Sequence, residues 1–140
     1  MEQLKVEKLS PTAKLPTRAY EGDAGLDLYA NEEVTIAPGA HLSIKTGIKM
    51  AIPMGFVGLV WDKGSMAKLG LHTIAGVVDA GYRGEVFIDV INLGSSEYSV
   101  KLGQKIAQIL IQPVALLEVC EGEIDNSERG ANCLGSSGLH

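Results

Sequence analysis

The residues best suited to chemistry lie in segment 75–84, whose sequence is Ala-Gly-Val-Val-Asp-Ala-Gly-Tyr-Arg-Gly. Its two valines predict a buried strand, and its glycines predict a hairpin whose backbone a ligand can approach closely. Asp79 is the carboxylate of this run, and the aromatic ring of Tyr82 follows closely. A carboxylate that faces a ligand can orient a water molecule and accept its proton. The competing interpretation is a solvated Asp-Ala-Gly turn, which is common in proteins.

Five segments of the chain, in order, resemble the five motifs of the trimeric dUTPase (dUTP pyrophosphatase) family. These segments are 23–30, 62–67, 75–84, 103–108 and 129–138. The resemblance covers nearly the whole chain and makes the solvated turn a minority interpretation. It implies hydrolysis of dUTP to dUMP and pyrophosphate, in which Asp79 orients the water that attacks the α-phosphate in line.

The resemblance also implies how the nucleoside is read. Tyr82 packs beneath the deoxyribose and leaves no room for a ribose hydroxyl. Uracil presents an N3–H donor between two carbonyl acceptors, so backbone groups of the hairpin, at Gly76 and Val78, can match it. For Arg83, an ion pair with an acidic residue and a direct phosphate contact both remain open.

Phosphate binding is expected from the second, fourth and fifth motifs. The expected residues are Lys63, Gly64, Ser65, Gln108, Arg129, Gly135 and Ser136, while Leu134 is expected over the uracil. Those after residue 128 form a flexible arm that can close over a triphosphate, and without ligand we expect this arm to be disordered. The family also places Asp27 near a Mg²⁺ ion that binds the triphosphate, through a water molecule, because Mg²⁺ keeps several waters.

Two motifs depart from the family pattern. The second carries Lys63-Gly64-Ser65 where Arg-Ser-Gly or Arg-Ser-Ser is usual, so an ammonium replaces the bidentate guanidinium. The fifth has Leu134 where an aromatic residue usually covers the uracil. These changes leave open a weakly catalytic nucleotide-binding relative.

Asp89 raises a further alternative. Related dCTP deaminases carry a catalytic Glu at about this position, so the protein could be a dCTP deaminase or a bifunctional deaminase and dUTPase. The adjacent pair Tyr82-Arg83 is typical of dUTPases, which favours dUTP hydrolysis. A polar contact between subunits along a threefold axis is the preferred role for Asp89.

Short Val/Ile/Leu runs separated by Gly, Pro and Asn predict a fold made of strands. The expected strands are 34–36, 42–50, 56–61, 86–92, 106–113 and 115–119, with at most a helical turn around residues 66–69. This pattern is typical of an all-β sandwich, jelly roll or barrel. The resemblance implies the distorted jelly-roll barrel of the dUTPase-like β-clip. We expect one β domain over residues 1–126 and the Gly/Ser-rich arm over residues 127–140.

The composition of the chain limits the kinds of partner that we expect for it. The net charge is −5 and the twelve Lys and Arg residues are scattered, which argues against a nucleic-acid surface. No apolar run is long enough to span a membrane and the N-terminus lacks a signal-peptide core, so we expect a cytoplasmic protein. Cys120 and Cys133 are expected as reduced thiols, and the histidines show no metal-ligand spacing. With 46% apolar residues, some apolar surface is expected to be covered by sister subunits; the family implies a homotrimer that exchanges its C-terminal arms.

Overall fold

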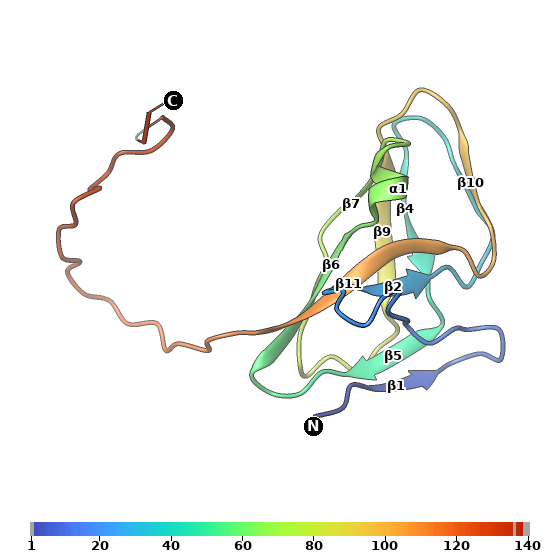
Figure 1. Ribbon diagram of the computed structural model, residues 1–140, viewed down its shortest axis with the longest axis horizontal. Coiled ribbons are helices and arrows are strands. Elements are labelled where there is room, and N and C mark those ends of the chain that lie inside the picture. The colour runs from blue at the N-terminus through green and yellow to red at the C-terminus, as the bar shows by residue number, and fades with distance from the viewer. Residues whose placement is uncertain (1, 136, 139–140) are drawn as a thin grey trace.

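Antiparallel strands build nearly all the regular structure of the computed structural model, which describes residues 2–135 and 137–138 (Figure 1). The all-β fold that the sequence predicts is therefore confirmed. Four of the expected strands, 34–36, 56–61, 86–92 and 106–113, appear with nearly the predicted bounds.

The first sheet has four strands in the order β2-β11-β6-β8. They are β2 (Leu26–Tyr29), β11 (Lys105–Pro113), β6 (Phe56–Asp62) and β8 (Val77–Val78). In its register, Gln108 of β11 lies between Asp27 of β2 and Trp61 of β6. This sheet therefore brings the first, second and fourth motifs together.

The second sheet has three strands in the order β4-β9-β7, and two strand pairs complete the body. The sheet consists of β4 (His41–Lys45), β9 (Phe87–Asn92) and β7 (Leu71–Thr73). The pairs are β1 (Lys5–Lys8) with β5 (Ile48–Ala51), and β3 (Val34–Ile36) with β10 (Tyr98–Val100).

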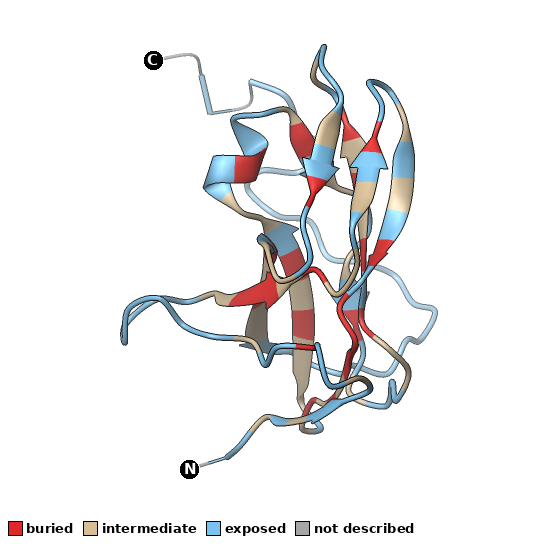
Figure 2. Cartoon of the chain, turned by 90° about the vertical axis from the view of Figure 1, so that its right-hand side faces the viewer, coloured by how far each residue is buried: buried red, intermediate tan, exposed pale blue. Residues whose placement is uncertain are grey.

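The core lies between the sheets and takes alternate residues of strands such as β5 and β9, and Figure 2 shows the buried positions. On β9, Ile88 and Val90 are buried. Asn92, also buried, donates through Nδ2 to the carbonyl oxygens of Ile36 and Ser96, each at 2.9 Å. A buried polar side chain without such partners would destabilise the fold.

The strand expected over 42–50 is instead two strands, β4 and β5, so that prediction is wrong in detail. Gly47 breaks it with a φ of +67°, and a Cβ there would lie 2.4 Å from the side-chain nitrogen of Asn31. The buried Thr46 hydroxyl donates to the carbonyl oxygen of Val86, which fixes the bend. Only glycine combines that φ with so close an approach.

The helical turn lies slightly earlier than predicted. It is α1 (Gly64–Ala67), which begins two residues before the predicted turn. Met66 is its buried anchor. No helix in the described ranges is long and apolar enough to cross a membrane.

Segment 115–119 forms no strand, which corrects the sixth strand prediction. Its side chains are exposed, Leu117 to 83% and Val119 to 96%, because the extended chain has left the sheets and meets no strand edge there (Figure 1). Every described residue from Gln112 onward is exposed. The boundary between residues 1–126 and 127–140 stays a prediction.

Candidate active site

The hairpin that carries Asp79 opens into a pocket. The backbone N–H of Ile74 donates to the carbonyl oxygen of Asp89 at 2.8 Å, joining β7 to β9. Beyond that point the chain leaves β9, because β8 pairs with β6 instead. The strands splay and enclose a pocket of about 260 Å³, lined by Val60, Ala75, Gly76, Val77, Val78, Asp79, Tyr82, Glu85, Val86, Phe87 and Asp89.

Two residues with positive φ make this divergence, Ala75 at +60° and Gly76 at +135°. A Cβ on Gly76 would lie 2.8 Å from the carbonyl oxygen of Val60. The Gly76 carbonyl in turn accepts from the Val60 N–H at 2.8 Å. Glycine is therefore required where the hairpin opens.

The turn at the other side of the pocket presents Asp79 and Tyr82. The N–H of Tyr82 donates to the carbonyl oxygen of Asp79 at 3.1 Å, and the Asp79 side chain is exposed. The Tyr82 ring lies against Gly84, where a Cβ would be 2.5 Å from the phenol oxygen, and its hydroxyl donates to the carbonyl oxygen of Glu85 at 2.7 Å. These two contacts hold the ring against the hairpin, and Tyr82 is 43% exposed.

Other residues of the hairpin have structural partners. A guanidinium nitrogen of Arg83 donates to the carbonyl oxygens of Ala80 at 2.6 Å and Tyr82 at 3.0 Å, so Arg83 braces the turn. The side chain of Val78 is buried, and Val78 pairs with Gly58 of β6. Asp89 lines the pocket and accepts a hydrogen bond from the Ser43 hydroxyl of the same chain.

A second cluster joins the first, second and fourth motifs around Asp27. Its Oδ1 lies 3.0 Å from Nζ of Lys63, and its Oδ2 lies 3.2 Å from Nζ of Lys105. Burial by itself raises the pKa of Asp27, but the ammonium groups of the two lysines outweigh it and hold that pKa below its ordinary value. Despite the ion pair, Oδ2 is buried and receives no well-directed hydrogen bond from the described residues.

Gln108 lies beside this cluster, half-buried on the sheet. A Cβ on Gly25 would be 2.0 Å from its Oε1, so the amide packs directly on the first motif. Its Nε2 donates to the carbonyl oxygen of Asp62 at 2.9 Å. Gly64 and Ser65, which follow in the second motif, are exposed.

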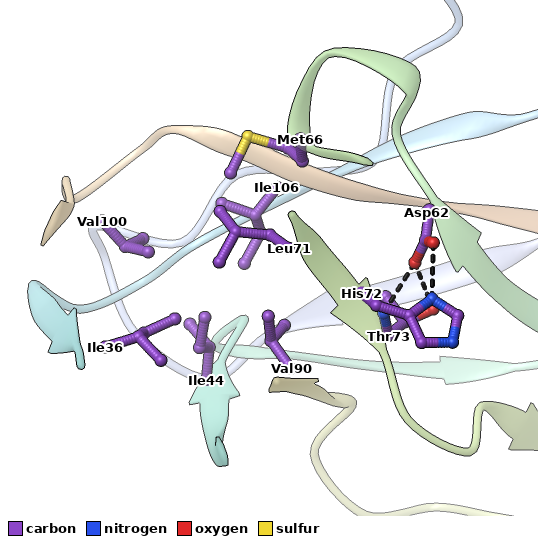
Figure 3. Close-up of a pocket in the computed structure, with 10 residues that line it drawn as sticks. All are labelled: Ile36, Ile44, Asp62, Met66, Leu71, His72, Thr73, Val90, Val100 and Ile106. Carbon is purple, nitrogen blue, oxygen red and sulfur yellow. Dashed lines mark hydrogen bonds and ion pairs between the residues drawn. The ribbon is translucent and has the colours of Figure 1, made fainter. Parts of the chain in front are cut away.

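Asp62 is a site residue that the sequence reasoning missed. Figure 3 shows its carboxylate facing β7: Oδ2 lies 2.6 Å from Nδ1 of His72, and Oδ1 accepts from the N–H of Thr73 at 2.6 Å and from its hydroxyl at 2.8 Å. Burial raises the pKa of Asp62, and these partners more than offset it, leaving the pKa below the ordinary value. In the sequence, only the position of Asp62 directly before Lys63 points to it.

One chain does not bring all the expected residues together. The pocket with Asp79 includes none of Asp27, Lys63 or Gln108. The arm lies apart from both sites (Figure 1), where Nε of Arg129 donates to the nearby carbonyl oxygen of Asn132 at 2.9 Å and Leu134 is fully exposed. Gly135, also exposed, has a φ of +83°, and Ser136 lies outside the described residues.

No cluster of three or more His, Cys, Asp or Glu side chains suited to a metal ion occurs in the described part of the chain. A metal held mainly by substrate phosphates needs no such cluster.

Comparison with known proteins identifies relatives of this chain. The family model for dUTPase matches residues 11–138. The deoxyuridine 5'-triphosphate nucleotidohydrolase of Mycobacterium leprae is 43% identical over 147 residues, which cover 98% of this chain and 96% of that protein. The nucleotidohydrolase of the same name from Corynebacterium diphtheriae is 41% identical over 140 residues, covering 96% of this chain and 92% of that protein.

Solved structures of similar fold are also dUTPases. A variant dUTPase of Staphylococcus bacteriophage 80alpha, determined with dUpNHpp, superimposes with a TM-score of 0.93 at 29% identity, covering 99% of this chain and 100% of that one. A variant dUTPase from phage phi11 of S. aureus, described with a structural Mg(II) ion, gives 0.82 at 27% identity, covering 88% and 98%. The fold is that of an all-β nucleotide hydrolase. The chain belongs to the dUTPase family.

Proposed function

We propose that the protein hydrolyses dUTP to dUMP and pyrophosphate by in-line attack of water on the α-phosphate. The observation that carries the proposal is the pocket in the opened hairpin, which Asp79 and Tyr82 line together. Family membership and the activity named for the relatives support it.

Asp79 is proposed to orient the attacking water and accept its proton, because its exposed carboxylate is free to face a ligand. Tyr82 is proposed to lie beneath the deoxyribose. Its hydrogen bond to Glu85 and its contact with Gly84 fix the ring, and a fixed ring excludes an added hydroxyl better than a mobile one.

The base is proposed to bind the backbone between Gly76 and Val78. The carbonyl oxygen of Gly76 is already used by Val60. The N–H of Gly76 donates to no group in the described ranges, so it is available to a uracil carbonyl.

The triphosphate is proposed to bind Lys63, Gly64, Ser65 and Gln108. Lys63 and Gln108 converge on one end of the first sheet through their contacts with Asp27 and Asp62. The remaining contacts are assigned to the arm, through Arg129, Gly135 and Ser136, with Leu134 over the base in place of the usual aromatic ring.

Dependence on Mg²⁺ is part of the proposal. Asp27 fits this role because its buried Oδ2 lacks a directed donor in the part of the chain described, so it can accept a hydrogen bond from a metal-bound water. Bound with the triphosphate, Mg²⁺ supplies charge neutralisation of the phosphates. Asp27 itself orders that water, and Lys105 keeps the carboxylate compensated.

We also propose a homotrimer in which subunits share sites and exchange arms. The separation of Asp79 from Lys63 and Gln108 in one chain supports this, since hydrolysis needs both sets at one nucleotide. An apolar groove of about 550 Å³ opens on the body, lined in part by Leu4, Leu15, Leu26, Phe56 and Ile111. We propose that this groove receives the exposed apolar side chains of a sister subunit's segment 114–119.

A cytoplasmic location, without nucleic-acid or membrane partners, completes the proposal. It is supported by the net charge of −5 and by the two exposed cysteines, neither of which is in a disulfide.

A second candidate, deamination of dCTP in addition to dUTP hydrolysis, is favoured by one observation: Asp89 lines the pocket that also contains Asp79. The pairing of Lys63 with Asp27 favours the other alternative, a weak nucleotide-binding relative, because it engages the cation that should contact phosphate.

One assay separates these candidates. The purified protein is incubated with dUTP, dCTP, dTTP and UTP, and both pyrophosphate and ammonia are followed. We expect pyrophosphate from dUTP alone, and we expect Asp79→Asn to lower turnover by roughly two to four orders of magnitude while nucleotide affinity stays within about tenfold. Ammonia from dCTP would establish the second candidate, and tight binding without turnover would establish the third.

A further inference from the structure

The carboxylate of Asp62 bridges two sheets that share no strand pairing. Asp62 is the last residue of β6, and β6 pairs only with β11 and β8 among the described strands. His72 and Thr73 belong to β7, which pairs with β9 in the other sheet. The hydrogen bonds in Figure 3 therefore tie the end of the first sheet to the edge of the second.

Each end of this bridge leads to a different part of the proposed site. On the first sheet, Asp62 directly precedes Lys63, and its carbonyl oxygen accepts from the amide of Gln108 at 2.9 Å. On the second sheet, Thr73 is followed at once by Ile74 and by Ala75, where the nucleoside hairpin begins to open.

The turn α1 is anchored in the core by Met66, but its exposed start has no side-chain cap. Lys63 is its N-cap residue and makes no side-chain cap hydrogen bond, because an ammonium group has no acceptor; it donates to Asp27 instead. Both Gly64 and Ser65 are exposed. The exposed start of this loop therefore follows directly from Asp62, whose side chain and carbonyl oxygen are both held.

We propose that Asp62 is a positioning residue for the triphosphate: by holding β6 to β7, it keeps the 63–65 loop and Gln108 in the arrangement in which they serve one nucleotide. The inference rests on the proposed function and deepens it. Asp62 touches no substrate in this role, and it acts through Lys63 and Gln108.

Asp62→Ala tests the bridge. Removing the carboxylate frees the loop, so the KM for dUTP should rise about tenfold or more, as expected for the loss of a charge-assisted hydrogen-bond network. Affinity for dUMP should stay within about twofold, because dUMP lacks the outer phosphates. Asp62→Asn retains an oxygen for the Thr73 N–H and hydroxyl, and it should restore the KM to within about threefold of the parent.

The matched control is Glu7→Ala, which removes an exposed acid that pairs with Lys49 on the distant β1-β5 pair. Glu7→Ala should leave the KM for dUTP and the affinity for dUMP unchanged. A merely structural role for Asp62 predicts a different result, in which the dUTP KM and the dUMP affinity worsen together. That result, or an unchanged KM in folded Asp62→Ala, would overturn the inference.

Two single changes keep the test decisive where Asp62→Ala does not fold. His72→Phe and Thr73→Val each remove one partner of the carboxylate, and each should raise the dUTP KM by about threefold with dUMP affinity unchanged. Equal KM values for both variants and the parent would overturn the inference. A parent protein without dUTP turnover would instead refute the proposed function itself.

Discussion

Lys63, expected at the triphosphate, forms an ion pair with Asp27, the Nζ atom lying 3.0 Å from Oδ1. Lys105 remains 3.2 Å from the other oxygen of the same buried carboxylate. Asp27 therefore keeps a cationic partner, Lys105, when Lys63 leaves the ion pair and turns toward a phosphate. This arrangement links the stability of the first sheet to nucleotide binding.

Lys63→Met should affect both properties. It removes one of two cationic partners from Asp27, so the free energy of unfolding should fall by about 1–3 kcal/mol in urea denaturation. The KM for dUTP should rise by about tenfold or more in the same protein. Lys63→Arg keeps the charge and adds a bidentate fork, and it should recover stability and tighten dUTP binding. A Met variant with parental KM would remove Lys63 from the phosphate site.

Acid should destabilise the fold through Asp27 and Asp62. Both carboxyl groups have folded-state pKa values below 3.8, the value expected in the unfolded chain. Their stabilising contribution is therefore fully present above that pH and is lost as the pH falls through the folded-state pKa. The double variant Asp27→Asn/Asp62→Asn should lose the steep part of this dependence below pH ~4. Urea denaturation of the parent and the variant from acid to neutral pH measures this dependence. If the free energy of unfolding changed with pH in the same way in both proteins, Asp27 and Asp62 would not be its source.

The sequence predicts the elements whose signals are local. The hairpin around Asp79 and Tyr82 is marked by its valines and glycines, and the structure shows β8 followed by a turn there. The bridge from Asp62 to His72 has no such signal, because it depends on how two unpaired sheets pack. Segment 115–119 has the composition of a strand but no partner within its own chain, and a strand needs a neighbour for its backbone hydrogen bonds.

Tyr82→Ala should relax the discrimination between sugars. Without the ring, the space beside the deoxyribose opens and a ribose hydroxyl fits, so the ratio of kcat/KM for dUTP to that for UTP should fall by roughly ten- to a hundredfold. Tyr82→Phe is the matched control, since it keeps the ring and loses only the hydrogen bond to Glu85. An unchanged ratio in the Ala variant would show that the sugar is read elsewhere.

Deletion of the chain from Glu128 onward should separate assembly from catalysis. The deleted segment makes only local hydrogen bonds in the described residues, such as that from Arg129 to Asn132, so the remaining body should keep its fold and its oligomeric state in analytical ultracentrifugation. Turnover of dUTP should fall by at least about a hundredfold, because closure of the arm excludes water and fixes the phosphates in line. Binding of dUMP should change by less than about threefold, since it offers no outer phosphates to Arg129. Undiminished turnover in the truncated protein would exclude the arm from the active site.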